Sequence, residues 1–127
     1  YVDHQLGRLL DALDRTPGMK NNTIIVLWSD HGFHIGEKSN WEKFALWDQT
    51  SRVPLFIHAP GVSKDGEKTR QPATLTDVYP TLCELAGLPI PGQCDGLSLV
   101  SQLKNPGAKR DRLALCSFQF GNEKTHP

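Results

Sequence analysis

The sequence contains no long run of apolar residues. Its longest run, residues 24–28, has the length of a β-strand, whereas a helix that crosses a membrane needs about 20 predominantly apolar residues. The first residues also lack the basic segment followed by an apolar segment that marks a secretory signal peptide. The second absence carries little weight, because the chain opens at Tyr1 rather than at a methionine. The absence of a long apolar run excludes a membrane-spanning helix within this sequence.

The sequence also lacks an excess of charge of either sign. Its 14 Lys and Arg residues balance its 14 Asp and Glu residues, so the formal net charge is zero, and no run of Lys and Arg forms a basic stripe. A polyanionic partner such as nucleic acid is therefore not expected. With 38% hydrophobic and 22% charged residues, the composition is that of an ordinary globular protein, and 127 residues suffice for one domain.

Closely spaced cysteine pairs are absent as well. The three cysteines are Cys83, Cys94 and Cys116, and none belongs to a C-x-x-C pair. This spacing argues against a zinc ribbon and against a thioredoxin-type redox site. One disulfide with one free thiol, or three buried thiols, both fit the sequence, which does not decide between them.

Helix and strand patterns alternate along the chain and predict an α/β layered fold, with a mostly parallel sheet flanked by helices. Residues 23–28 are apolar and rich in β-branched side chains, which is typical of a strand buried at the centre of a parallel sheet. Residues 29–52 show no clean period, and a long loop of this kind is more often functional than filler. The other predicted elements are helices over 1–16, 76–86 and 97–104 and strands over 53–58 and 112–118.

A carboxylate and an imidazole follow the apolar strand directly, in the segment Ser29-Asp30-His31-Gly32. Loops at the carboxyl ends of sheet strands are where ligands bind in open α/β sheets. Asp offers a hard oxygen for Ca²⁺ or Mg²⁺, and His suits softer divalent ions. The dipeptide alone is weak evidence, because an Asp that caps a turn beside a backbone-bonded His would give the same two letters. Its surroundings decide between the two interpretations.

The longer segment, residues 29–61, reads SDHGFHIGEKSNWEKFALWDQTSRVPLFIHAPG. It resembles the sulfatases of the alkaline phosphatase superfamily, especially the branch that contains iduronate sulfatase. Weaker matches lie on both sides, in residues 1–13, 75–82 and 95–99, so the resemblance covers nearly the whole chain. Residues 1–127 are therefore expected to be the C-terminal portion of a single sulfatase catalytic domain. The matching positions in the main segment are Asp30, His31, Gly32, Gly36, Glu37, Trp41, Lys43, Asp48, Val53, Pro54, Leu55, Pro60 and Gly61.

The resemblance implies roles for four residues. Asp30 is expected to bind one divalent cation, which is usually Ca²⁺ in this family, and His31 either binds the same ion or hydrogen-bonds the sulfate. Lys43 is expected to bind a sulfate oxygen, a task that suits a compact charge with three donors. His34 either reaches the edge of the substrate site or only hydrogen-bonds within its own loop.

Other residues of the motif have plainer expected roles. Trp41 and Trp47 are expected to pack and order the long loop rather than to stack on a sugar. Glu37 and Asp48 are expected to be local bonding partners, for example of Lys38 or Arg52, rather than acid–base catalysts.

The family nucleophile is missing from this sequence. Family members make a formylglycine from a Cys or Ser in a Cys/Ser-x-Pro-x-Arg motif, and none of Cys83, Cys94 and Cys116 has a proline two positions on. The early pair of metal-binding aspartates and the histidine that protonates the leaving alcohol are also not identifiable. Because loss of a nucleophile costs many orders of magnitude in rate, we expect this polypeptide alone to be inactive and to pair with the remainder of its catalytic domain.

The resemblance implies hydrolysis of a sulfate ester, with a sulfated small molecule or glycan as partner. A phosphodiesterase or phosphonate hydrolase of the same superfamily is a second interpretation, although the Gly36-Glu37 and Trp41-x-Lys43 motifs favour a sulfatase. A non-catalytic binding protein on the same scaffold is a third. Compartment and oligomeric state stay open, and export or a lysosomal location is expected only by analogy with the family.

Overall fold

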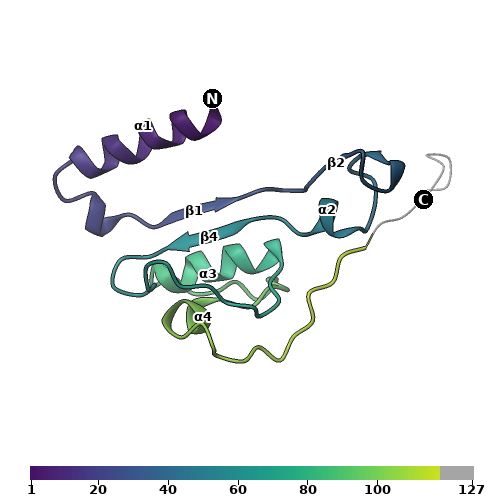
Figure 1. The fold of residues 1–127 in the computed structure, drawn as a ribbon. Coiled ribbons are helices and arrows are strands. Elements are labelled where there is room, and N and C mark those ends of the chain that lie inside the picture. The colour runs from purple at the N-terminus through teal and green to yellow at the C-terminus, as the bar shows by residue number, and fades with distance from the viewer. Residues whose placement is uncertain (118–127) are drawn as a thin grey trace.

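The computed structural model describes residues 1–117, which form a mixed α/β arrangement (Figure 1). Two strands run side by side through the middle, and short helices lie on either side of them in this view. The helices are α1 (Val2–Arg15), α2 (Asp48–Ser51), α3 (Val78–Leu85) and α4 (Val100–Lys104), the strands are β1 (Ile25–Trp28), β2 (His34–Ile35), β3 (Trp41–Glu42) and β4 (Leu55–His58), and the 3-10 turns are η1 (Lys20–Asn22), η2 (Glu37–Ser39) and η3 (Leu75–Asp77).

Helix α1 confirms the first predicted helix. It ends where Thr16 donates its backbone N–H to the carbonyl of Leu13 and its hydroxyl to the carbonyl of Ala12, just before Pro17 and Gly18. The helix is amphipathic, yet none of its residues is buried, and Leu9 is 68% exposed. The apolar stripe that usually covers a core is thus only partly covered by residues 1–117, with Leu6 and Leu13 half-buried.

The central sheet consists of β1 and β4 in an antiparallel pair, with Ile25 opposite His58 and Trp28 opposite Leu55. This corrects the expectation of a parallel neighbour for the strand at residues 23–28. The apolar run indicated burial on both faces, and it held no information about the direction of the neighbouring strand. In the described part of the chain β1 pairs with β4 alone, so its other edge carries no strand there.

The second sheet is a small antiparallel hairpin of β2 and β3. It lies inside the segment 29–52, where the sequence indicated no regular element, because strands of two residues are too short to show a period. The hairpin and α2 lie beyond the carboxyl end of β1, at the same end of the central pair (Figure 1). This end of the sheet is where the motif residues gather.

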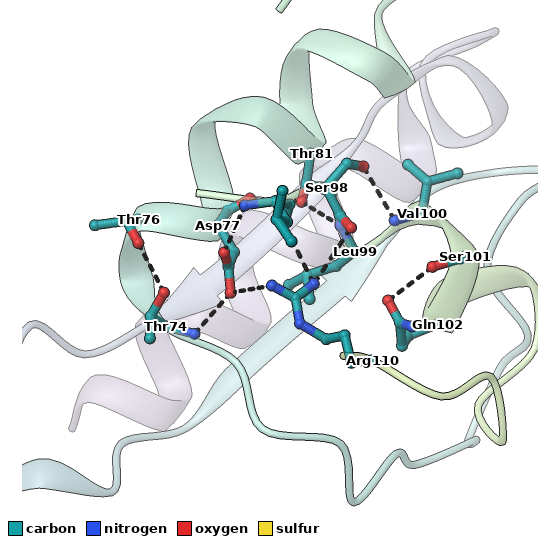
Figure 2. Close-up of polar contacts among 11 residues, drawn as sticks. Thr74, Thr76, Asp77, Thr81, Ser98, Leu99, Val100, Ser101, Gln102 and Arg110 are labelled. Carbon is teal, nitrogen blue, oxygen red and sulfur yellow. Dashed lines mark hydrogen bonds and ion pairs between the residues drawn. The ribbon is translucent and has the colours of Figure 1, made fainter. Parts of the chain in front are cut away.

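A buried ion pair between Asp77 and Arg110 stabilises the C-terminal half of the described chain. Asp77 is 1% exposed, and its carboxylate accepts hydrogen bonds from the N–H groups of Thr74 and Leu97, each at 2.8 Å. Arg110 Nη2 lies 2.8 Å from the same carboxylate (Figure 2). Thr81, also buried, accepts the N–H of Leu99 at 2.8 Å. These contacts hold the segment after α3 against that helix, beside the buried apolar residues Ala59, Cys83, Leu99 and Val100.

Three predicted details of this half need correction. The helix predicted over 76–86 is shorter, because α3 covers Val78–Leu85 and follows the turn η3, where Thr74 and Asp77 form a capping box. The helix predicted over 97–104 is shorter and begins at Val100, because residues 97–99 bond back to α3 and η3 instead. Residues 112–117 of the predicted last strand are not in a strand, and Phe118 lies outside the described residues.

All three cysteines are free, with Cys83 buried, Cys94 partly buried and Cys116 exposed. The structure thus shows neither of the arrangements that the sequence left open, a disulfide or three buried thiols. Among residues 1–117, no helix is both long enough and apolar enough to cross a membrane.

Candidate metal and sulfate site

The turn after β1 presents Asp30 to solvent and folds the chain back at His31. Ser29 Oγ donates to the carbonyl of His31 at 2.7 Å, and the N–H of His31 donates to Asp30 Oδ1 at 3.0 Å. The Asp30 side chain is 82% exposed. The carboxylate therefore lies exposed just beyond the end of the strand.

Gly32 lets this turn approach α2 more closely than any other residue could. Its N–H donates to the carbonyl of Thr50 at 2.9 Å, and a Cβ at this position would lie 1.9 Å from the carbonyl oxygen of Gln49. Thr50 is itself buried, and its hydroxyl donates to the carbonyls of Ala45 and Trp47. The Asp30–His31 turn thus rests on α2 through a contact that requires glycine.

His31 and Lys43, which are twelve positions apart, meet through their side chains. Lys43 Nζ lies 2.8 Å from His31 Nε2, and His31 Nδ1 lies 2.7 Å from the carbonyl oxygen of Gly32. An ammonium group can only donate and a carbonyl can only accept. His31 is therefore neutral here, with its proton on Nδ1 and its Nε2 lone pair toward Lys43.

Asp30 completes the cluster, since its Oδ2 lies 3.6 Å from His31 Nε2. With the imidazole neutral, this contact is two acceptors side by side rather than a salt bridge. Two acceptors at this spacing fit one divalent ion, whose oxygen ligands sit about 2.3–2.6 Å away. Within residues 1–117 no set of three or more His, Cys, Asp and Glu residues could hold a metal by itself. The pair can supply at most part of a coordination shell.

The β2–β3 hairpin presents Lys43. His34 faces Glu42 across it, and Ile35 faces Trp41, so Lys43 leaves the hairpin directly after the last paired residue. At the turn, Glu37 Oε2 accepts the N–H of Ile35 at 2.8 Å. This bond, helped by the N–H of Glu37 itself, lowers the pKa of the Glu37 carboxyl below its usual value.

His34 belongs to β2, and its ring is fully buried. Neither ring nitrogen has a hydrogen-bond partner among the described residues, although Glu37 Oε2 is 3.9 Å from Nδ1. The chain's own residues cover the ring. Of the two roles the sequence left open for His34, neither an exposed position at the edge of the site nor a hydrogen bond within the loop is seen here.

The aromatic and acidic residues of the motif take mixed roles. Trp47 is only half packed, with its ring 52% exposed, and Lys38 Nζ sits 4.2 Å from its ring centroid. Trp41 is also exposed and lies against Gly36. Glu37 bonds backbone rather than Lys38. The Lys38–Trp47 contact was not foreseen, because no local pattern marks a pair nine positions apart in a loop.

These residues place one carboxylate, one imidazole and one ammonium close together at the same end of a sheet. Comparison with known proteins names the family. The sequence profile described as Sulfatase matches residues 1–88. The chain belongs to the sulfatase family, as its motifs indicate.

Two relatives illustrate the match. A sulfatase of Formosa agariphila is 42% identical over 122 residues, which make up 96% of this chain and 24% of that protein. Iduronate 2-sulfatase of Mus musculus is 34% identical over an alignment of 118 residues, which covers 74% of this chain and 21% of that protein. The chain thus spans about a quarter or less of the relatives it matches.

Two solved structures confirm the fold class. A protein in complex with its substrate D-glucosamine-2-N,6-O-disulfate matches with a TM-score of 0.78 and 37% identity, over 85% of this chain and 22% of that one. A phosphonate monoester hydrolase from Silicibacter pomeroyi matches with a TM-score of 0.77 and 36% identity, over 81% of this chain and 20% of that one. The fold is therefore the alkaline-phosphatase-like α/β fold.

Proposed function

We propose that this chain supplies part of the metal and sulfate site of an enzyme that hydrolyses a sulfate ester, with a sulfated carbohydrate as substrate. The observation that carries the proposal is the meeting of Asp30, His31 and Lys43, with contacts of 3.6 Å and 2.8 Å around His31 Nε2. The structural neighbour that binds D-glucosamine-2-N,6-O-disulfate as its substrate supports the substrate class.

Lys43 is the catalytic residue in this proposal. Its ammonium binds a sulfate oxygen and stabilises the negative charge that grows there as the S–O bond breaks, which a fixed cation does best in a site that excludes water. The 2.8 Å bond to His31 Nε2 holds this ammonium at the site before substrate arrives. Bound sulfate then offers a more negative acceptor than the imidazole, so Lys43 turns from His31 to the anion.

Asp30 is the metal ligand in this proposal, and the ion is Ca²⁺. The exposed Asp30 carboxylate suits that ion, which prefers oxygen ligands. His31 fits Ca²⁺ less well by chemical type, and its single Nε2 lone pair can serve Lys43 or a metal but not both at once. His31 thus either completes the ion's shell or donates to sulfate when protonated. The ion, when bound, supplies positive charge to the sulfate oxygens.

His34 is the fourth predicted site residue. We propose that it supports the sulfate site by holding the hairpin in place, since its ring is buried and its backbone pairs with Glu42, the neighbour of Lys43. Direct contact with substrate would require the hairpin to move.

We further propose that residues 1–127 form the C-terminal portion of a single catalytic domain, and that the remainder of the domain brings the formylglycine nucleophile, the other metal ligands and the general acid. The share of the relatives that the chain spans supports this. So do the uncovered apolar side chains of α1, β1 and β4, which include Leu9, Trp28 and Phe56. On this proposal the isolated chain has no sulfatase turnover, and robust metal-dependent hydrolysis of an aryl sulfate by it would contradict the proposal.

A phosphonate or phosphodiester hydrolase is the second candidate, because a phosphonate monoester hydrolase has nearly the same backbone over this region. The two proposals are separated by the turnover of 4-nitrophenyl sulfate, 4-nitrophenyl phosphate and a phenylphosphonate monoester by the full-length protein. The sulfatase proposal predicts the highest kcat/KM for the sulfate. A higher kcat/KM for either phosphorus ester would transfer the assignment to the second candidate.

A non-catalytic binding protein is the remaining alternative. The full-length protein would then turn over none of the three esters, while an Asp30→Ala change would still alter its affinity for Ca²⁺ in a calorimetric titration. The retained geometry of Asp30, His31 and Lys43 supports an active enzyme instead.

A further inference from the structure

The turn that joins β2 to β3 is strained. Lys38 and Ser39 have φ angles of 54° and 56°, in the left-handed region that residues other than glycine rarely adopt. Glu42, which precedes Lys43, has a φ of 138°. Such strain persists only where surrounding contacts hold the backbone in place. The segment that presents Lys43 therefore needs an anchor.

Lys38 provides a contact that can act as this anchor. Its Nζ sits 4.2 Å from the centroid of the Trp47 ring, within the distance over which a cation is attracted to an aromatic face. Trp47 is fixed in turn, because its carbonyl accepts the N–H groups of Thr50 at 2.9 Å and Ser51 at 3.1 Å. The tip of the hairpin is thus tied to the start of α2.

Helix α2 also supports the other half of the site. The carbonyl of Thr50 accepts the N–H of Gly32 at 2.9 Å, and Gly32 adjoins His31 in the chain. Lys43 and His31 are therefore both attached to the same short helix. Lys43 is attached through the contact of Lys38 with Trp47, and His31 through the hydrogen bond of Gly32 to Thr50. The distance between Lys43 Nζ and His31 Nε2 depends on both attachments.

We propose that Lys38 is a positioning residue for Lys43: its contact with the Trp47 ring closes the loop 39–46 and holds the Lys43 ammonium at the sulfate site. The inference rests on the proposed function, in which Lys43 binds sulfate. Closing a short loop removes most of the conformations it could otherwise adopt. The long, flexible Lys43 side chain then starts from a fixed backbone.

The contact between Lys38 and the Trp47 ring requires a positive charge at residue 38. An arginine can also place a cation over an indole ring, whereas methionine has similar length and no charge. Leucine at position 47 removes the ring and keeps an apolar side chain. These substitutions separate the cation–ring contact from simple packing.

The test is a double-mutant cycle in the full-length protein, with kcat/KM for 4-nitrophenyl sulfate as the readout. Lys38→Met and Trp47→Leu are each expected to lower kcat/KM about two- to fivefold, the range that corresponds to an exposed cation–ring contact. Lys38→Arg is expected to keep kcat/KM near the original value. Combining Lys38→Met with Trp47→Leu is expected to cost no more than either change alone, and Lys64→Met, on an exposed loop lysine, is the matched control.

The decisive arm repeats Lys38→Met in a Lys43→Ala background. If Lys38 acts through Lys43, the change costs nothing further there, and thermal unfolding midpoints stay equal. An equal loss in both backgrounds would show a general structural role and overturn the proposal, as would an unchanged kcat/KM for Lys38→Met alone. If Lys43→Ala itself leaves kcat/KM unchanged, the proposed function fails first and this inference fails with it.

Discussion

Lys43 and His31 are joined by a 2.8 Å hydrogen bond from Nζ to Nε2, although twelve positions separate them in the chain. The bond fixes the tautomer of His31, because the other ring nitrogen donates to the carbonyl of Gly32. It also places a positive charge 2.8 Å from an atom that is itself 3.6 Å from the Asp30 carboxylate. The Lys43 ammonium and the Asp30 carboxylate thus both lie near the same ring nitrogen of His31.

Replacing Asp30 by alanine is expected to weaken Ca²⁺ binding by the full-length protein at least tenfold. Loss of a residue that only supports a metal ligand already lowers metal affinity by about tenfold or more, and loss of a proposed ligand should lower it at least as much. Calorimetric titration measures this. Asp65→Ala is the matched control, since Asp65 is also exposed and also lies beside a histidine, 3.3 Å from His58 Nδ1. Equal Ca²⁺ affinity in the two variants would remove Asp30 from the metal site.

Gly32→Ala is expected to lower the stability of the full-length protein by about 1–3 kcal/mol, the usual cost of forcing an extra carbon into a packed site. The new Cβ would meet the carbonyl oxygen of Gln49 at 1.9 Å, so the turn must leave α2. Thermal unfolding by calorimetry gives the change.

Gly7→Ala is the matched control for that measurement. Gly7 lies inside α1 with nothing within 4 Å of a Cβ added there, and alanine in a helix interior is favoured over glycine by about 0.5–1 kcal/mol. We therefore expect opposite signs for the two glycines. Destabilisation by Gly7→Ala as large as that by Gly32→Ala would refute the interpretation of Gly32 as a close-approach residue.

Arg110→Ala is expected to destabilise the protein by about 3–5 kcal/mol, because it leaves the Asp77 charge buried without its partner. The pair closes the contact between α3 and the segment around residue 110 (Figure 2). Arg70→Ala, at an exposed position, should leave the unfolding midpoint nearly unchanged. Similar midpoints for the two variants would show that the ion pair contributes little.

The closeness of Asp30, His31 and Lys43 could be predicted from the sequence because these residues stand in short motifs. Asp30 and His31 follow an apolar strand, and Lys43 stands at a fixed distance from them in the family pattern, so their convergence required no knowledge of the sheet. The burial of His34 could not be foreseen in the same way. It depends on which of the two side chains of β2 points toward the protein interior. A strand of two residues is too short for an alternation of apolar and polar residues to show this.

The fold was predictable at the level of class and less so in its pairing. The apolar pattern of residues 23–28 located β1 but could not show that β4 runs antiparallel to it. Residues 112–117 have strand-like composition without strand structure, since composition does not supply a neighbouring strand to bond with. The Lys38–Trp47 and Asp77–Arg110 contacts join distant positions, which a single sequence does not reveal.

The most direct test of the account is the effect of Lys43→Ala on hydrolysis of 4-nitrophenyl sulfate by the full-length protein, with Lys64→Ala as the control. Removal of a group that stabilises charge in the transition state lowers kcat by about 10²–10³. We expect a loss in that range for Lys43→Ala, no rescue by Lys43→Arg, because the guanidinium has a different shape, and full activity for Lys64→Ala. Equal activity of Lys43→Ala and Lys64→Ala would contradict the assignment of the site.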